Sequence, residues 1–212
     1  MQSLKKLQLS LMAMLALGAA IAGAAAAAEG ELLGAIGTAT LTQNATLTFE
    51  STGGGIAVKC PSSEGSLTYE SSTKGSFDDL HLGCTAGGFK CTGLTDSTAG
   101  SILVKGAWEV LAFKEGASLK LALVYVLSPV HFECLGILTE IRGGRIGLID
   151  NANGIKTTKI TALFTGSSGK ESITEVNGVN HHLESSTGGS AFVEDSVSQN
   201  VTATGVELEV MY

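Results

Sequence analysis

Four cysteines are the residues of this chain with the most definite chemistry. They are Cys60, Cys84, Cys91 and Cys134, and successive members lie 24, 7 and 43 positions apart. Structural zinc sites usually draw their ligands from close C-x-x-C pairs, which these spacings do not provide. An even number of cysteines in an exported chain predicts disulfide bonds instead.

The spacing also suggests how the cysteines pair. Six residues that include two adjacent glycines separate Cys84 from Cys91, and such a loop can reverse the chain and bring both cysteines opposite each other. We therefore predict Cys84–Cys91 and Cys60–Cys134, in which the second pair joins the ends of two similar segments, IAVKC and VHFEC. The main alternative is Cys60–Cys84 with Cys91–Cys134, which would join sequential strands.

Motifs for catalysis or metal binding are not found in the sequence. GSSGK, at 166–170, fits neither a nucleophile elbow nor a phosphate loop, and H-E-x-x-H does not occur. His181 and His182 are neighbours on an expected strand, so their rings should point to opposite faces, which favours a solvated hairpin over a metal site. With all cysteines paired, His131 has no free thiol to activate. We predict no catalytic, cofactor-binding or metal-binding residue.

Carboxylates leave one enzymatic alternative open. Asp78 and Asp79 are adjacent, as are Glu194 and Asp195, so each pair should alternate across a strand or lie in a loop. A glycosidase needs two carboxylates across a cleft, and only the tertiary structure can bring these together. The segment 150–153 (DNAN) lacks the bidentate glutamate of a calcium loop and is expected to form a hairpin turn.

The N-terminal segment, residues 1–28, is expected to be a signal peptide. Two lysines precede 22 uncharged residues, Leu7 to Ala28, and the small residues at its end fit the A-x-A rule. Cleavage would leave a chain that begins at Glu29, as N-terminal sequencing of the exported protein can check. A retained membrane anchor is the alternative, since this length can span a bilayer. No further membrane span is predicted after cleavage.

Composition limits the function of the remaining residues, 29–212, which are expected to form a single domain. The formal net charge of the full chain is −7 and no basic cluster remains after residue 28, so nucleic acid is not expected as a partner. Apolar residues make up 44%, which argues against disorder. Aromatic residues are only 5%, too few for an exposed sugar-binding platform. Trp108 belongs to an alternating apolar set and should pack in the core.

Period-two patterns predict an all-β fold. Apolar and threonine residues alternate over 38–49, and the run LKLALVYV at 119–126 is apolar on both faces, as in a strand buried on both sides. Asn153-Gly154 and Asn177-Gly178 are typical of two-residue hairpin turns. No helical period is found in the mature chain. We predict an antiparallel β-sandwich or flattened barrel with two disulfides, with central strands between Cys84 and Cys134.

The cysteine and glycine pattern resembles a known group. Its features here are IAVKC, HLGCTAGGFKCTG with a polar loop after it, VHFECLGILTEIRGGRIGLID, an Ala-rich leader and a Thr/Ser/Gly-rich tail. In these features the chain resembles uncharacterised secreted all-β proteins of soil actinobacteria, from about Ile56 to the end. The run LALVYVLSPV and the His-His pair depart from that pattern. The resemblance implies export and a β-rich fold, and it implies no activity.

Together these observations predict a secreted or cell-surface protein with a non-enzymatic envelope, adhesion or binding role. No cofactor is expected, and the cell envelope is the expected setting for its partner. Two alternatives stay open. One is a secreted hydrolase whose carboxylates meet only in the fold, and the other is a small-ligand carrier with an empty apolar interior.

Overall fold

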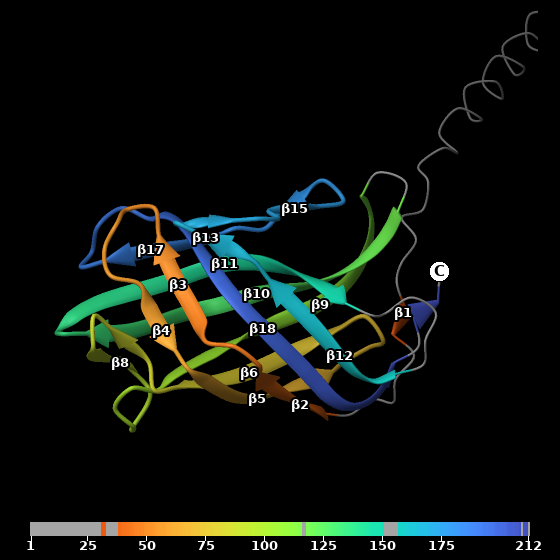
Figure 1. Cartoon of the computed structure of the whole chain (residues 1–212), viewed down its shortest axis with the longest axis horizontal. Helices are drawn as coiled ribbons and strands as arrows, with labels where there is room; N and C mark the ends of the chain where they lie inside the picture. Colours follow the sequence, from red (N-terminus) through yellow and green to blue (C-terminus); the bar gives the residue numbers. More distant parts are fainter. Residues whose placement is uncertain (1–30, 33–37, 116–117, 151–156, 209, 212) are drawn as a thin grey trace, which may run out of the picture.

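The computed structural model describes residues 31–32, 38–115, 118–150, 157–208 and 210–211 (Figure 1). These residues form strands and their connections, with no helix among them, and every strand pairing is antiparallel. The all-β prediction is confirmed. The first strands are β1 (Glu31–Leu32), β2 (Thr38–Gln43), β3 (Leu47–Ser51), β4 (Val58–Cys60), β5 (Ser62–Tyr69), β6 (Lys74–Leu82), β7 (Thr85–Ala86), β8 (Phe89–Gly93) and β9 (Ile102–Glu115). The others are β10 (Ser118–Cys134), β11 (Ile137–Asp150), β12 (Thr157–Phe164), β13 (Gly166–Ser167), β14 (Lys170–Glu171), β15 (Glu175–Val176), β16 (Val179–Asn180), β17 (Leu183–Thr187), β18 (Val193–Leu208) and β19 (Val210–Met211).

The main sheet closes on itself. In one half of the molecule the pairing runs from β2 through β5, β6, β9, β10, β11 and β12 to β18, and β18 pairs again with β2. In the other half it runs from β3 through β4, β7, β8, β10, β11 and β17 to β18, which pairs with β3. The long strands β10, β11 and β18 run through both halves. The fold is therefore a closed antiparallel sheet, not two separate sheets.

Large rings fill the first of these halves, which we call the aromatic half. Phe77 stacks on Tyr125 with ring centroids 4.3 Å apart, and Phe164 lies 5.1 Å beyond Tyr125. Trp108 meets Tyr69 edge to face at 4.8 Å, and its indole Nε1 donates a hydrogen bond to a backbone carbonyl on β5. The core role predicted for Trp108 is confirmed.

Two glycines within strands give these rings their space. A Cβ atom on Gly106 would lie 2.1 Å from the carbonyl oxygen of Val126 and 2.8 Å from the ring of Phe77, and one on Gly147 would lie within 2.9 Å of three ring atoms of Phe164. Distances this short are repulsive. Gly147 is therefore needed for the close approach of the Phe164 ring, and Gly106 for the close approach of both the β10 backbone and the Phe77 ring.

The apolar run of β10 is buried on both faces, as predicted. Leu121, Leu123 and Tyr125 point into the closed sheet, whereas Ala122 and Val124 point outward. The hairpin formed by β15 and β16 covers the outward side chains and contributes Val176 to this second small core. Burial on both faces thus comes from the interior on one side and a folded-over hairpin on the other.

Asn177-Gly178 forms the turn of that hairpin. Val176 pairs with Val179 around it, and Asn177 and Gly178 both have positive φ, 52° and 80°, as a type I′ turn requires. The Asn177 side chain also donates a hydrogen bond to the carbonyl of Ala112. The predicted hairpin is confirmed here. The other predicted turn, at Asn153-Gly154, lies outside the described residues.

The predicted disulfide pairing is wrong, and the alternative pairing is the one present. The bonds are Cys60–Cys84 and Cys91–Cys134. Cys84 and Cys91 do lie opposite each other, but the Cys91 amide donates to the Cys84 carbonyl at 3.0 Å. Such hydrogen-bonded pairs hold their Cα atoms about 5.5 Å apart, whereas side chains come closer in non-hydrogen-bonded pairs. The bonded cysteines, with Cα distances of 4.1 and 4.3 Å, occupy positions of the closer kind.

Candidate functional site

The second half of the closed sheet opens at the end where β10 turns into β11. A pocket of about 420 Å³ lies there, within the ~300–1,000 Å³ that is usual for ligand sites. Its lining comes from β3, β4, β7, β10, β11 and β17, which together with β8 follow one another around the ring, and from the β3–β4, β10–β11 and β13–β14 connections. We call it the mouth pocket. Its lining residues are Phe49, Glu50, Ser51, Gly54, Gly55, Ile56, Ala57, Val58, Ala86, Phe132, Cys134, Leu135, Ile137, Thr139, Ser168, Ser185 and Thr187.

The mouth pocket has an apolar floor. Phe49, Val58 and Phe132 are buried core residues, and all three point into the closed sheet beneath the opening. Exposed apolar side chains, Ile56 and Leu135 among them, stand at the rim and are 68% and 62% exposed. An apolar group that entered the pocket would therefore be shielded from water on several sides.

Hydroxyl groups line one side of the mouth pocket. Thr139 on β11 and Thr187 on β17 lie 3.4 Å apart through their Oγ1 atoms, and Ser185 lies two positions before Thr187 on the same strand. Asp195 is fully buried next to them. Burial raises the pKa of its carboxyl to about 6, and the hydroxyls of Ser185 and Ser51 partly offset that rise. An apolar floor with a few polar groups on one side is typical of small-molecule sites.

Apolar side chains also gather around the opening. A second groove, of about 520 Å³, adjoins the mouth pocket and shares Leu135 with it. We call this surface the apolar end; its exposed side chains are Ile56, Phe89, Leu94, Leu135, Ile137 and Leu138. It lies at the left of Figure 1, near β8, while the end strand β1 lies at the right. Exposed apolar patches of this kind mark binding surfaces.

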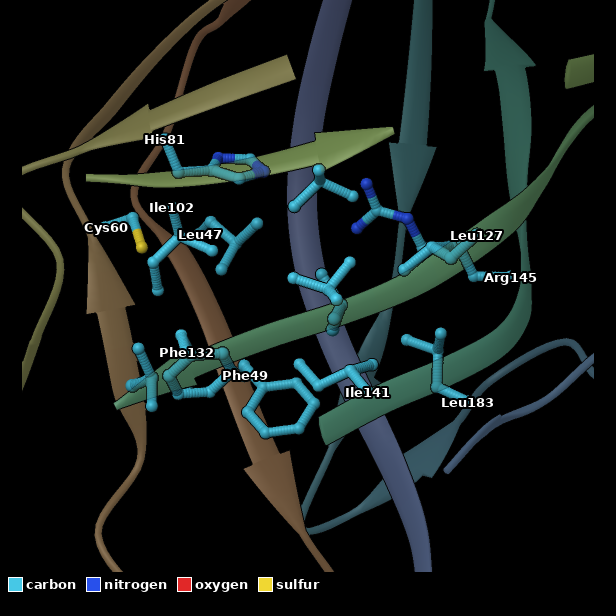
Figure 2. A pocket seen from close by; sticks show the side chains of 14 residues that line it. Leu47, Phe49, Cys60, His81, Ile102, Leu127, Phe132, Ile141, Arg145 and Leu183 are labelled. Atoms are coloured by element: carbon cyan, nitrogen blue, oxygen red, sulfur yellow. The ribbon is translucent and has the colours of Figure 1, made fainter. Parts of the chain in front are cut away.

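A small cavity lies beneath the mouth pocket (Figure 2). Its volume is about 50 Å³ and its walls are almost entirely carbon, with Phe49, Val58 and Phe132 shared with the pocket above. His81 and Arg145 border it on the side away from Phe49 and Phe132. This volume is several times smaller than an ordinary ligand site. The geometry therefore favours ligand binding at the mouth over binding deep in the interior.

Four buried polar residues separate this cavity from the aromatic half. Arg145 Nη2 donates to Gln199 Oε1 at 2.6 Å, and Gln199 Nε2 lies 3.4 Å from Asp79 Oδ2. The same carboxylate oxygen is 3.4 Å from His81 Nε2. We call Asp79, His81, Arg145 and Gln199 the buried polar cluster. None of them is more than 3% exposed, so the cluster is out of reach of a substrate in solution.

Burial and neighbouring charges set the ionisation of the buried polar cluster. Burial lowers the pKa of His81 and Arg145 lowers it further, against the opposing effect of Asp79, so the imidazole is neutral near pH 7. The Arg145 guanidinium lies 4.4 Å from the ring centroid of Phe164 and 5.4 Å from that of Tyr125. The positive charge of Arg145 is thus stabilised by two aromatic ring faces and by the polar atoms of the cluster. The buried polar cluster is therefore a structural element of the core.

The sequence left open whether Asp78 and Asp79 alternate across a strand or lie in a loop, and it did not predict the buried polar cluster. Asp78 is 55% exposed and lies 3.4 Å from Lys105, whereas Asp79 points inward. The burial of Asp79 was predictable, because it alternates with Phe77 and His81 on the same face of β6. Its partners Arg145 and Gln199 could not be found in this way, since they come from distant strands.

Glu171 closes a gap in the wall of the sheet. On one edge of β18, β17 pairs with 193–195 and β12 pairs with the stretch from Gln199, which leaves 196–198 between them. The β13–β14 hairpin fills that gap. Glu171 Oε1 accepts a hydrogen bond from the Val197 amide at 2.9 Å, and the Gly169 amide donates to Ser196 Oγ at 3.0 Å. Burial raises the pKa of Glu171 to about 7, while the Val197 amide and Arg145 lower it.

Replacing Glu171 with glutamine is expected to stabilise the protein at pH 8 by about 1–2 kcal/mol and to leave it unchanged at pH 4. The folded-state pKa, about 7, lies above the ordinary value of 4.5. The stability that this group contributes is therefore fully present below pH 4.5 and is lost as the pH rises through 7. Burial also raises the pKa of Asp195, from 3.8 to about 6, so its ionisation destabilises the folded state as well. The wild type should therefore lose stability from pH 4 to pH 7.

Urea unfolding at both pH values measures this effect. Glutamine at 171 can still accept the Val197 hydrogen bond, so the change removes only the charge. Glu175→Gln, at an exposed position on β15, is the matched control and should shift neither curve. Equal stability of Glu171→Gln and the wild type at pH 8 would contradict the expectation.

A polar groove of about 420 Å³ lies where the β13–β14 hairpin meets β18. Its lining residues are Gly169, Lys170, Glu171, Thr174, Asn180, His182, Glu194 and Asp195. Glu171 is held by the Val197 amide, whereas Asp195 pairs with Ser51 and interacts with Ser185 on the side of the mouth pocket. Glu171 Oε2 and both oxygens of Asp195 accept no hydrogen bond among the described residues, and burial raises the pKa of both carboxyl groups.

The histidines singled out in the sequence are not brought together. His181 and His182 lie between β16 and β17 instead of on a strand, and His182 Nε2 is 3.4 Å from Glu184 Oε1. His131 lies across the β10–β11 ladder from Glu140, at 3.5 Å. Within the described ranges, no three His, Cys, Asp or Glu side chains are placed to hold a metal ion.

Comparison with known proteins identifies no relative of this chain. Neither a protein-family model, nor a curated protein, nor a solved structure matches the chain. In the part of the chain that the structure describes, no helix has the length and apolarity needed to cross a membrane.

Proposed function

We propose that this protein is a secreted or cell-surface binding module, without enzymatic activity, that takes its ligand in the mouth pocket. The observation that carries the proposal is the pocket itself, which is ringed by the ends of successive strands and combines an apolar floor with an exposed apolar rim. Its two disulfides fit a non-reducing, extracellular setting.

The lining of the mouth pocket defines the class of ligand. Phe49, Val58 and Phe132 favour a compact apolar body. The hydroxyls of Thr139 and Ser185 on one side favour a ligand that also carries one or two hydrogen-bonding groups. A small amphipathic molecule meets both requirements, and the pocket volume of about 420 Å³ limits its size.

Binding of a neutral solvatochromic dye tests the proposal. We expect saturable binding with one site per chain, and we expect Leu135→Asp to weaken it at least tenfold, about 1.4 kcal/mol, because a charge then stands at the rim. Leu163→Asp is the matched control. Leu163 on β12 is also exposed, at 44%, but lies away from the mouth pocket.

The two variants separate a specific site from general stickiness. Equal loss of dye binding in Leu135→Asp and Leu163→Asp, or binding that does not saturate, would contradict the proposal. Unchanged urea unfolding of both variants would show that the sheet itself is intact. A library of small amphipathic compounds can then be ranked by displacement of the dye.

A further inference from the structure

The four cysteines form a continuous row across neighbouring strands. Val58 and Lys59 on β4 pair with Ala86 and Thr85, so the next pair along the ladder is Cys60 and Cys84, which are bonded. The Cys91 amide donates to the Cys84 carbonyl at 3.0 Å, and Cys91 on β8 pairs with Cys134 on β10. The order across the strands is therefore Cys60, Cys84, Cys91, Cys134. Each inner cysteine has a cysteine neighbour on both sides.

Only one end of this row is open to solvent. Cys84 and Cys91 are 0% exposed and Cys60 is 2% exposed. Cys134 is only partly buried, and it lines the mouth pocket. Thiol–disulfide exchange requires access to the sulfur that is attacked. A thiol from solution can therefore reach the Cys91–Cys134 bond at Cys134.

We propose that Cys134 is a modification site for a small-molecule thiol that enters the mouth pocket, and that the row passes the exchange inward to Cys60. In the first step, the external thiolate attacks Cys134 Sγ and forms a mixed disulfide, and Cys91 leaves as a thiolate. In the second step, Cys91 attacks Cys84 Sγ and forms Cys84–Cys91, and Cys60 leaves as a thiolate. Each step forms one S–S bond and breaks one, so no oxidant is needed.

The backbone already holds the partners of the second step in place. One hydrogen bond, from the Cys91 amide to the Cys84 carbonyl, joins the two residues, and the Cα atoms of hydrogen-bonded pairs lie about 5.5 Å apart. This separation is wider than the 4.1 and 4.3 Å of the two bonds present, which the ladder favours, but it lies within the range of about 4.4–6.8 Å that disulfides accept. The new bond therefore forms without separating β7 from β8, and it removes the covalent links to β4 and β10 at the mouth. The proposal uses the mouth pocket as the route for the thiol and does not depend on which ligand binds there.

Peptide mapping of the native mature protein tests the proposal. The protein is incubated with excess glutathione, free thiols are blocked with N-ethylmaleimide under mildly acidic conditions, and the chain is digested with trypsin without reduction. The positions of lysine and arginine place each cysteine on its own tryptic peptide: 60–74, 75–90, 91–105 and 121–142. We expect glutathione on 121–142, a disulfide between 75–90 and 91–105, and a blocked thiol on 60–74.

Several outcomes would overturn the proposal. Glutathione on 60–74 or 75–90 would show attack on the buried end of the row. Glutathione on 121–142 with a blocked thiol on 91–105, and the bond between 60–74 and 75–90 intact, would show that the exchange stops after one step. Absence of any adduct, while the same protein reacts in guanidinium chloride, would show that Cys134 is not accessible in the fold.

A variant without the Cys60–Cys84 disulfide isolates the first step. In the double variant Cys60→Ser, Cys84→Ser, Cys91 has no disulfide to attack, so glutathione on 121–142 should appear together with a blocked thiol on 91–105. Retention of the wild-type near-ultraviolet circular dichroism of Trp108 would show that the variant is folded. Absence of the 121–142 adduct in the folded variant would contradict attack at Cys134.

Discussion

Replacing Asp79 with alanine is expected to lower the free energy of unfolding by about 3–5 kcal/mol, because the change leaves a buried charge without its partner. Asp79 is 1% exposed and accepts from Gln199, which in turn accepts from Arg145. Without this carboxylate, the Arg145 guanidinium would stay buried among Tyr125, Phe164 and the apolar cavity. Burial already lowers the pKa of Arg145, and Asp79 is one of the groups that raise it.

Asp78→Ala is the matched control for this prediction. It removes the same group from the adjacent residue of β6, where the ion pair with Lys105 is exposed to solvent. Exposed pairs of this kind contribute about 0–1 kcal/mol. Urea unfolding at pH 7 measures both variants. Similar losses for Asp78→Ala and Asp79→Ala would contradict a special role of the buried carboxylate.

The double variant Asp79→Ala, Arg145→Met tests the reason for the loss. Methionine removes the charge that Asp79 balances and keeps a long apolar side chain beside Phe164. If the unpartnered charge causes the instability, the double variant should regain at least half of the stability that Asp79→Ala loses. Additive losses for the two changes would show that packing, not charge, governs this part of the core.

Replacing Trp108 with alanine is expected to lower the free energy of unfolding by about 3–5 kcal/mol. Trp108 is 2% exposed and contacts Tyr69 edge to face at 4.8 Å, and its Nε1 donates to the carbonyl of Thr68. Alanine would leave a large void in the aromatic half and would remove the hydrogen bond. The residues that close around the ring belong to paired strands and cannot collapse into the void.

Trp108→Phe separates packing from hydrogen bonding. Phenylalanine keeps most of the ring volume but leaves the Thr68 carbonyl without its indole donor, so we expect a loss of about 1–3 kcal/mol. Phe89→Ala is the control, because Phe89 is 52% exposed and should cost little. Chemical denaturation followed by far-ultraviolet circular dichroism measures all three. A loss for Trp108→Ala no larger than for Phe89→Ala would contradict the assignment.

Local sequence patterns were sufficient for the strands and for their faces. Period two identified the inward positions, including Trp108 and the alternating residues of β10, because successive side chains on a strand point to opposite faces whatever the strand pairs with. The Asn177-Gly178 hairpin was predictable for the same kind of reason, since its turn requires two residues that accept positive φ. The fold class followed from these local rules.

The disulfide pairing shows where local reasoning stops. The short glycine loop does bring Cys84 opposite Cys91, as predicted. Which neighbours bond depends on the alternation of hydrogen-bonded and non-hydrogen-bonded pairs along each ladder. That alternation is set by the register of β4, β7, β8 and β10, which no single segment of the sequence encodes.

The candidate sites depend on the same non-local information. The mouth pocket exists because six strands end around one opening. The buried polar cluster exists because two polar residues of β6 and one each of β11 and β18 point toward the same part of the interior. The sequence by itself determined which residues face inward and which cysteines are available to bond. Only the closed sheet decided which of them meet, because contacts between distant strands are fixed by ring order and register, and neither leaves a periodic signal within one strand.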